Sequence, residues 1–168
     1  MPCACRLPIE EYPDAAEWGP ILWRLLHGLA ERSGRPVTPL YAEDERRAWL
    51  QMFKETGEII PCKTCKEHFQ TYLAQHPVTE LKTLPLEDLH EWVRTWFWEV
   101  HEWVNGSLEK PSFPKETLAA TYKDVSLRPL IRALDKPMMT AITLSGINLK
   151  KYSDWKRRYT VLLSLYGL

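Results

Sequence analysis

LEDLHEWVRTWFWEVHEWV, residues 86–104, repeats its large apolar side chains at intervals of three and four. That spacing places them on one face of an α-helix, a face wide enough to be buried against other helices. Pro85, followed by Glu87 and Asp88, predicts where this helix begins, because proline and acidic residues favour a first turn. The predicted buried stripe consists of Leu89, Trp92, Val93, Trp96, Val100, Trp103 and Val104.

The patterns before this stretch also predict helices. Residues 18–29 carry an apolar stripe that ends before Gly34 and Pro36, and further helices are expected at 43–56 and 61–75. No convincing alternation of apolar and polar residues indicates a strand. The sequence therefore predicts an all-α protein with a four-helix core in residues 15–124, preceded by an N-terminal arm, residues 1–14.

Residues 125–168 are predicted to form an additional C-terminal helical segment. Pro129, Pro137 and Gly146 are expected to break it into two or three short helices, the last from Ser153 to about Tyr166. The segment holds eight Lys or Arg and two Asp, a net charge of +6, so residues 1–124 carry −6 because the whole chain is neutral. Opposite charges of this kind can simply pack together, and the overall neutrality argues against a nucleic-acid partner.

The chain is not expected to bind a membrane. No apolar run approaches the length of about 18 residues that crosses a bilayer. The first residues, MPCACR, lack the apolar core of a secretory signal.

Four cysteines occur, as two close pairs: Cys3 with Cys5, and Cys62 with Cys65. Two such pairs are too few for a disulfide scaffold, which leaves a metal site or redox chemistry. Cys62 and Cys65 are three positions apart at a predicted helix N-terminus, where free backbone N–H groups and the helix dipole stabilise a thiolate. A zinc site stays open as the alternative, although the remaining Cys and His do not have the usual ligand spacing and no metal site is predicted.

Aromatic and histidine residues form two further candidate groups. Trp23 and His27 are four apart on the first helix, and Trp98, His101 and Asn105 share a face of the 86–104 helix distinct from its apolar stripe. Taken singly, each is an ordinary core or surface residue. Two helices that both carry Trp and His away from their stripes favour a slot for a flat cofactor, and a dithiol needs an acceptor for two electrons that no side chain supplies.

Three motifs, in this order, resemble the Erv/ALR family of FAD-linked sulfhydryl oxidases. WGPILWRLLHGLA, residues 18–30, is similar to the first FAD-binding helix of that family. PCKTCKEHF, residues 61–69, resembles its redox centre, and WFWEVHEWVNGSLEKPSF, residues 96–113, resembles its HNxVNxxLxKPxF signature.

The resemblance implies a four-helix bundle that holds FAD, usually in a homodimer. It places Cys65 against the isoalloxazine as the charge-transfer thiolate and makes Cys62 the outer, interchange cysteine. Trp98, on the helix face described above, is a further candidate contact, and Tyr122 falls where the family often has an aromatic near the adenine. The positions that match flavin contacts are Gly19, Trp23, His27, His68, His101, Val104, Asn105, Leu108 and Lys110.

The chain departs from the family pattern at several positions. Glu102 replaces the usual Asn after the histidine, Pro20 stands where Arg is common, and no cysteine follows the last motif. Family members commonly relay electrons through a second cysteine pair on a flexible arm, so Cys3 and Cys5 are the candidate shuttle pair. The alternative is two spare thiols near the chain terminus.

The expected function is oxidation of protein dithiols to disulfides by Cys62 and Cys65, with electrons passing to FAD and then to molecular oxygen to give hydrogen peroxide. The rival interpretation is a non-enzymatic helical interaction domain with a zinc-binding CxxC. With no targeting segment apparent, the expected compartment is the host cytoplasm for a virus-encoded enzyme, and otherwise the mitochondrial intermembrane space.

Overall fold

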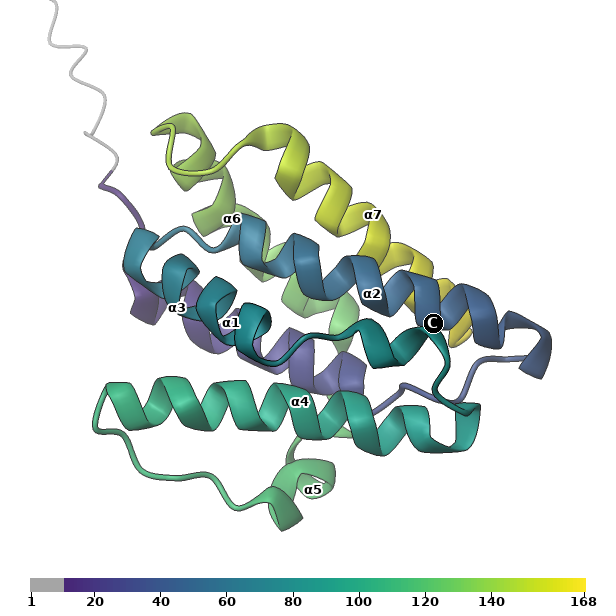
Figure 1. Cartoon of the computed structure of the whole chain (residues 1–168). Coiled ribbons are helices and arrows are strands. Elements are labelled where there is room, and N and C mark those ends of the chain that lie inside the picture. Colours follow the sequence, from purple (N-terminus) through teal and green to yellow (C-terminus); the bar gives the residue numbers. More distant parts are fainter. Residues whose placement is uncertain (1–10) are drawn as a thin grey trace, which may run out of the picture.

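The computed structural model describes residues 11–168, and their regular structure is helical throughout (Figure 1). The four predicted core helices are α1 (Ala15–Ala30), α2 (Ala42–Ile59), α3 (Lys63–Gln75) and α4 (Leu86–Ser107). A short helix, α5 (Leu118–Tyr122), follows, and then α6 (Leu127–Thr143) and α7 (Leu149–Leu165). The 3₁₀ turns are η1 (Pro39–Tyr41), η2 (Thr79–Lys82) and η3 (Lys115–Thr117). The prediction of an all-α fold is confirmed.

Local signals explain where the site-bearing helices begin. Asp14 accepts a hydrogen bond from the Ala16 amide, and Glu17 accepts one from the Asp14 amide, which together form a capping box at the start of α1. Cys62 caps α3, so this helix begins at Lys63 rather than at Pro61. The candidate redox pair, Cys62 and Cys65, therefore brackets the first turn of α3.

Aromatic side chains fill the space between α2 and α4. Phe53 and Phe97 stack with centroids 4.7 Å apart, and Trp96 meets Phe53 edge-on at 4.6 Å. Phe53 and Phe97 are completely buried, as is Trp49 beside them. Each such side chain contributes on the order of 2 kcal/mol through burial, so this cluster is a major contribution to the packing of α2 against α4.

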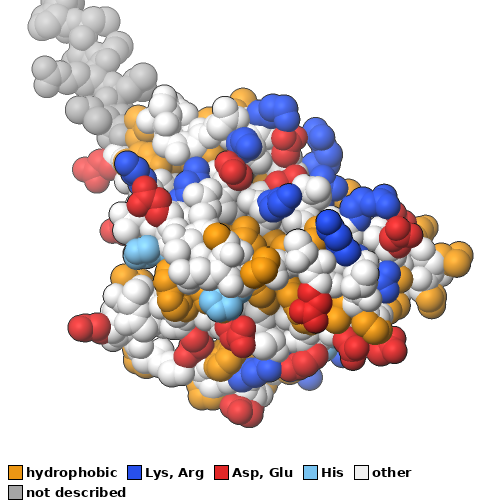
Figure 2. Space-filling view, in the orientation of Figure 1, with side chains coloured by type: hydrophobic (Ala, Val, Ile, Leu, Met, Phe, Trp, Pro, Cys, Tyr) orange, Lys and Arg blue, Asp and Glu red, His pale blue; other side chains and the backbone are white. Residues whose placement is uncertain are grey.

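The C-terminal helices complete the same core: α6 packs on α1, and α7 packs on α2. The Trp155 indole donates to Thr56 Oγ1 at 3.0 Å, and the Trp49 indole donates to the Tyr166 hydroxyl at 2.9 Å. Two ion pairs join α7 to α2: Arg158 with Glu55 and Lys151 with Glu58, each at 3.6 Å. Figure 2 shows basic side chains gathered on the side of the molecule where α7 lies in Figure 1. Some of the opposite charges of the two segments thus neutralise each other within the molecule. The proposed boundary at residue 124 stays a prediction.

The expected breaks at Pro129 and Pro137 are wrong. Pro129 lies in the first turn of α6, where no backbone N–H needs a partner, and α6 continues through Pro137, which is buried. Packing against α1 therefore outweighs the backbone hydrogen bond that Pro137 cannot make. The chain does turn around Gly146, and α7 begins at Leu149 rather than Ser153 because the Asn148 side chain caps it. No helix in the described part of the chain is long and apolar enough to cross a membrane.

Candidate active site

The first part of the site is a disulfide at the start of α3. Cys62 and Cys65 are bonded, with Cα atoms 5.2 Å apart, and the Cys65 amide donates to Cys62 Sγ at 3.2 Å. Both cysteines are partly exposed. Free N–H groups of a helix N-terminus stabilise negative charge on sulfur, so reduction of this bond releases thiolates where the backbone favours them.

The second part is a stack of rings between α1, α4 and α5. Trp23 and His101 lie face to face, with centroids 3.9 Å apart and planes 4° apart. His27 Nε2 lies 2.9 Å from His101 Nδ1, and the His27 ring stacks on Tyr122 at 4.7 Å. Four candidate site residues from three separate segments of the sequence are thus brought together.

The two imidazoles are held neutral. Burial, with a contribution from the nearby His101, lowers the pKa of His27 to about 3, and burial lowers the pKa of His101 to about 4. A neutral imidazole has one ring N–H and one lone pair, so the pair can donate and accept hydrogen bonds without a net charge. Such groups can form hydrogen bonds with the ring nitrogens and N–H groups at the edge of a neutral heterocycle.

The segment after α4 is anchored by Glu102, the residue that replaces the usual Asn of the family. Its carboxylate accepts from the Phe113 amide at 2.9 Å, from the Ser112 hydroxyl, and from the Asn105 amide group at 3.4 Å. The Trp98 indole donates to the Phe113 carbonyl at 2.7 Å. Glu102 therefore acts as a hydrogen-bond acceptor that fixes residues 112 and 113.

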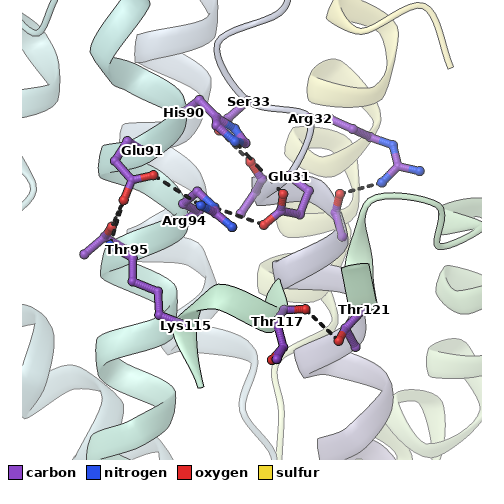
Figure 3. A network of polar contacts seen from close by, with 12 residues as sticks. Glu31, Arg32, Ser33, His90, Glu91, Arg94, Thr95, Lys115, Thr117 and Thr121 are labelled. Carbon is purple, nitrogen blue, oxygen red and sulfur yellow. Dashed lines mark hydrogen bonds and ion pairs between the residues drawn. The ribbon is translucent and has the colours of Figure 1, made fainter. Parts of the chain in front are cut away.

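A network of polar contacts holds the end of α1 against α4 (Figure 3). Glu31, buried at the end of α1, accepts from Arg94 at 3.1 Å, and Glu91 accepts from both Arg94 and Lys115. The Lys115 hydrogen bond lowers the pKa of Glu91 to about 2. Because Lys115 belongs to η3, the network also ties the chain just before Tyr122 to α4.

The remaining predicted contacts lie on α1, α3 and α4 and just beyond the end of α4. His68 meets Trp103 edge-on at 5.7 Å, between α3 and α4. Leu108 and Lys110 are exposed just beyond α4, and Val104 and Asn105 are half-buried in its last turn. Gly19 is buried, yet a Cβ there would meet no atom of the described residues within 4 Å, so space is free beside α1 one turn before Trp23.

Two residues near the disulfide were not predicted to belong to the site. The Tyr12 hydroxyl donates to the Pro61 carbonyl at 2.7 Å, and Gly146, from the turn between α6 and α7, packs against the Tyr12 ring. No sequence motif marks Tyr12, and Gly146 was expected only as a helix break, because both residues meet the site through contacts over long separations. Cys3 and Cys5, the candidate shuttle pair, lie outside the described residues.

A metal site finds no geometric support in residues 11–168. No group of three or more His, Cys, Asp or Glu is arranged there to hold a metal ion. Cys62 and Cys65 are bonded to each other, which leaves neither sulfur as a free thiolate ligand.

Comparison with known proteins agrees with this geometry. The model of the Erv1 / Alr family matches residues 20–123, which include the disulfide and the ring stack. A FAD-linked sulfhydryl oxidase ERV1 of Oryza sativa subsp. japonica is 31% identical over 106 residues, 63% of this chain and 49% of the relative. The mitochondrial FAD-linked sulfhydryl oxidase erv1 of Schizosaccharomyces pombe (strain 972) is 31% identical over 101 residues, 60% of this chain and 50% of the relative.

The chain spans about half the length of these two curated relatives. No solved structure gives a significant match. The family match covers well over half of the chain and contains both parts of the site, so the chain belongs to the Erv1/Alr family.

Proposed function

We propose that this protein is an FAD-dependent sulfhydryl oxidase that forms disulfides in reduced proteins and passes the electrons to molecular oxygen, producing hydrogen peroxide. One observation carries the proposal. A disulfide that caps a helix occurs in the same small domain as a stack of neutral aromatic and imidazole rings, within the matched family region.

The residues around the ring stack fit FAD. Trp23 and His101 stack on each other with planes 4° apart, so a planar heterocycle can stack on the outer face of this pair, and the free space beside Gly19 adjoins the same helix. In the proposed site Trp23, His27, His101 and Tyr122 hold the planar rings, Trp98 and Asn105 support them from α4, and Lys110 offers a cation for the phosphates. When bound, FAD supplies a two-electron acceptor that oxygen regenerates.

The chemistry of this chain's own residues begins at Cys62. A substrate thiolate attacks Cys62 Sγ, a new disulfide joins substrate and Cys62, and Cys65 leaves as a thiolate at the N-terminus of α3. The second substrate thiol then attacks the substrate sulfur of this mixed disulfide, which releases oxidised substrate and leaves Cys62 and Cys65 reduced. Two protons and two electrons have then moved from the substrate to this pair.

We also propose that Cys3 and Cys5 relay electrons from folded substrates to Cys62. The Tyr12 hydrogen bond ties the chain to Pro61, the residue before Cys62. Cys5 is seven residues before Tyr12, and seven residues span at most about 25 Å. Cys62 is thus within reach of this pair by covalent geometry alone.

The assembly and compartment are proposals of the same kind. A homodimer is expected from the family, and since α6 and α7 cover parts of α1 and α2, its interface must use other surfaces. The fission-yeast relative is named as mitochondrial, which supports the intermembrane space, whereas host cytoplasm follows if the protein is virus-encoded. Light scattering, which measures the mass in solution, tests the homodimer. Localisation of the tagged full-length protein tests the compartment.

The deciding experiment uses the purified chain. We expect a yellow protein with one FAD for each chain and oxygen consumption that depends on dithiothreitol. A colourless protein that contains stoichiometric zinc would instead establish the rival interaction domain.

A further inference from the structure

A pocket of about 420 Å³ opens beside Cys62, lined by residues of the α2–α3 turn and by Gly146 of the α6–α7 turn. Both turns lie toward the same end of the molecule (Figure 1). Cys62 is part of its wall, whereas Cys65 is not. Cys62 is the proposed point of attack. The substrate residues on either side of an attacking cysteine therefore have to occupy this pocket. The other lining residues used below are Tyr12, Pro61, Lys63, Lys66 and Gly146.

Three segments distant in sequence interlock to form the pocket. Tyr12 donates to the Pro61 carbonyl at 2.7 Å, and Gly146 packs so closely on Tyr12 that a Cβ at this position would collide with the ring. The family match ends at residue 123, so Gly146 comes from a part of the chain outside that match. The part of the pocket wall that Gly146 forms is therefore contributed by the α6–α7 turn, which lies outside the region that matches the family.

The rim of the pocket is cationic. Lys63 is exposed and Lys66 is half-buried, and neither makes an ion pair with any residue from 11 to 168. Glu58, in the last turn of α2, is paired with Lys151 at 3.6 Å. The two lysines are consequently available to an incoming carboxylate, and they also favour the thiolate form of an incoming cysteine.

We propose that this pocket is a substrate subsite, and that it selects reduced protein segments in which a carboxylate lies next to the attacking cysteine. The proposal rests on the proposed function only for the exchange step. In that step the substrate thiolate forms a bond to Cys62 Sγ, the Cys62–Cys65 bond breaks, and its electron pair leaves on Cys65. Apolar substrate atoms lie on Tyr12 and Pro61, and the carboxylate lies between Lys63 and Lys66.

The test measures the first exchange directly, in the full-length Cys3→Ser/Cys5→Ser protein loaded with FAD. Three peptides are identical except that a single cysteine is flanked by Glu, Gln or Lys. Formation of the mixed disulfide is followed by rapid acid quench and mass spectrometry. Each rate is divided by that peptide's rate with a neutral small disulfide, which removes differences in thiol acidity.

We expect the order Glu, Gln, Lys, with about a tenfold difference between the extremes at low salt that shrinks toward unity in 1 M salt. Lys63→Gln/Lys66→Gln should remove the order, whereas the exposed control pair Lys82→Gln/Lys136→Gln, with the same change in charge, should preserve it. Gly146→Ala should lower the Glu-peptide rate relative to the dithiothreitol rate. Equal peptide rates, the reverse order, or an order that survives the Lys63/Lys66 change would overturn the subsite.

Failure of the subsite and failure of the proposed function are distinguishable. Flavin content and oxygen uptake with dithiothreitol test the oxidase and do not involve the peptides. An active oxidase that reacts equally with all three peptides keeps its function and loses the subsite. A flavin-free protein that still shows the charge order, and loses it with Lys63 and Lys66, keeps the subsite and loses the oxidase.

Discussion

The imidazoles of His27 and His101 meet across the α1–α4 interface, with Nε2 of His27 2.9 Å from Nδ1 of His101. In this hydrogen bond one ring donates and the other accepts. Protonation of both rings removes the acceptor and places two positive charges side by side in a buried site. The contact therefore exists only while at least one ring is neutral.

This relationship predicts acid sensitivity of the flavin-free protein. The pKa of His27 is lowered to about 3 and that of His101 to about 4, so below pH 6.5 the unfolded chain binds protons that the folded chain does not. Stability should fall as pH decreases from about 6.5 to 4, by roughly 2 kcal/mol or more at pH 5 relative to pH 7.5. Urea unfolding at several pH values measures this loss. His27→Gln/His101→Gln should flatten the dependence, and the exposed His76→Gln should not.

Trp23→Ala should release FAD, because it removes the ring that lies parallel to His101. A ligand at 100 times its Kd adds about 2.7 kcal/mol to folding stability, so the melting temperature should also fall. The ratio of flavin to protein absorbance and a thermal melt check both effects. Trp155→Phe, in the α7 core, serves as a control that destabilises without flavin loss. Unchanged flavin content in Trp23→Ala would show that Trp23 does not bind FAD and serves only in packing.

Cys65→Ser should abolish oxygen consumption with dithiothreitol and leave FAD bound, because the ring stack is intact while the disulfide cannot form. Cys62→Ser should also be inactive. Thr64→Ala, between the two cysteines and exposed, should retain turnover. Normal oxygen uptake by Cys65→Ser in an oxygen electrode would refute the assigned redox pair.

Cys3→Ser/Cys5→Ser should keep its activity with dithiothreitol and lose much of its activity with a reduced, folded protein. The small dithiol reaches Cys62 directly, whereas a bulky substrate needs the arm. Parallel oxygen-electrode assays with the two substrates measure the ratio. An unchanged ratio would leave Cys62 and Cys65 as the sole redox pair and make Cys3 and Cys5 spare thiols.

Tyr166→Phe should destabilise the protein by about 1–3 kcal/mol, because it leaves two buried groups short of a partner. The Tyr166 hydroxyl donates to the fully buried Glu45 at 2.5 Å and accepts from the Trp49 indole at 2.9 Å. Denaturant unfolding at constant flavin saturation measures the change. Tyr41→Phe, on a partly exposed ring without a side-chain hydrogen bond among the described residues, is the matched control and should change stability by less than about 0.5 kcal/mol.

Local sequence determined the helices and indicated the candidate redox pair. Helix positions depend on apolar periodicity and caps within a few residues, which is why residues 86–104 predicted α4 and why Cys62 and Cys65 were recognisable at the start of α3. The same local reasoning misjudged Pro129 and Pro137, because the packing of α6 on α1 offsets a missing hydrogen bond and no local signal contains that packing.

Tertiary structure alone decided which residues meet. The 2.9 Å contact of His27 with His101 joins residues 74 positions apart, and the Tyr12–Pro61 hydrogen bond joins residues 49 apart. Gly146 reaches the pocket beside Cys62 only because α6 and α7 pack on α1 and α2. Such contacts depend on how several apolar faces are buried at once. The sequence therefore indicates which residues are candidates for the site, but only the folded structure determines which of them are in contact.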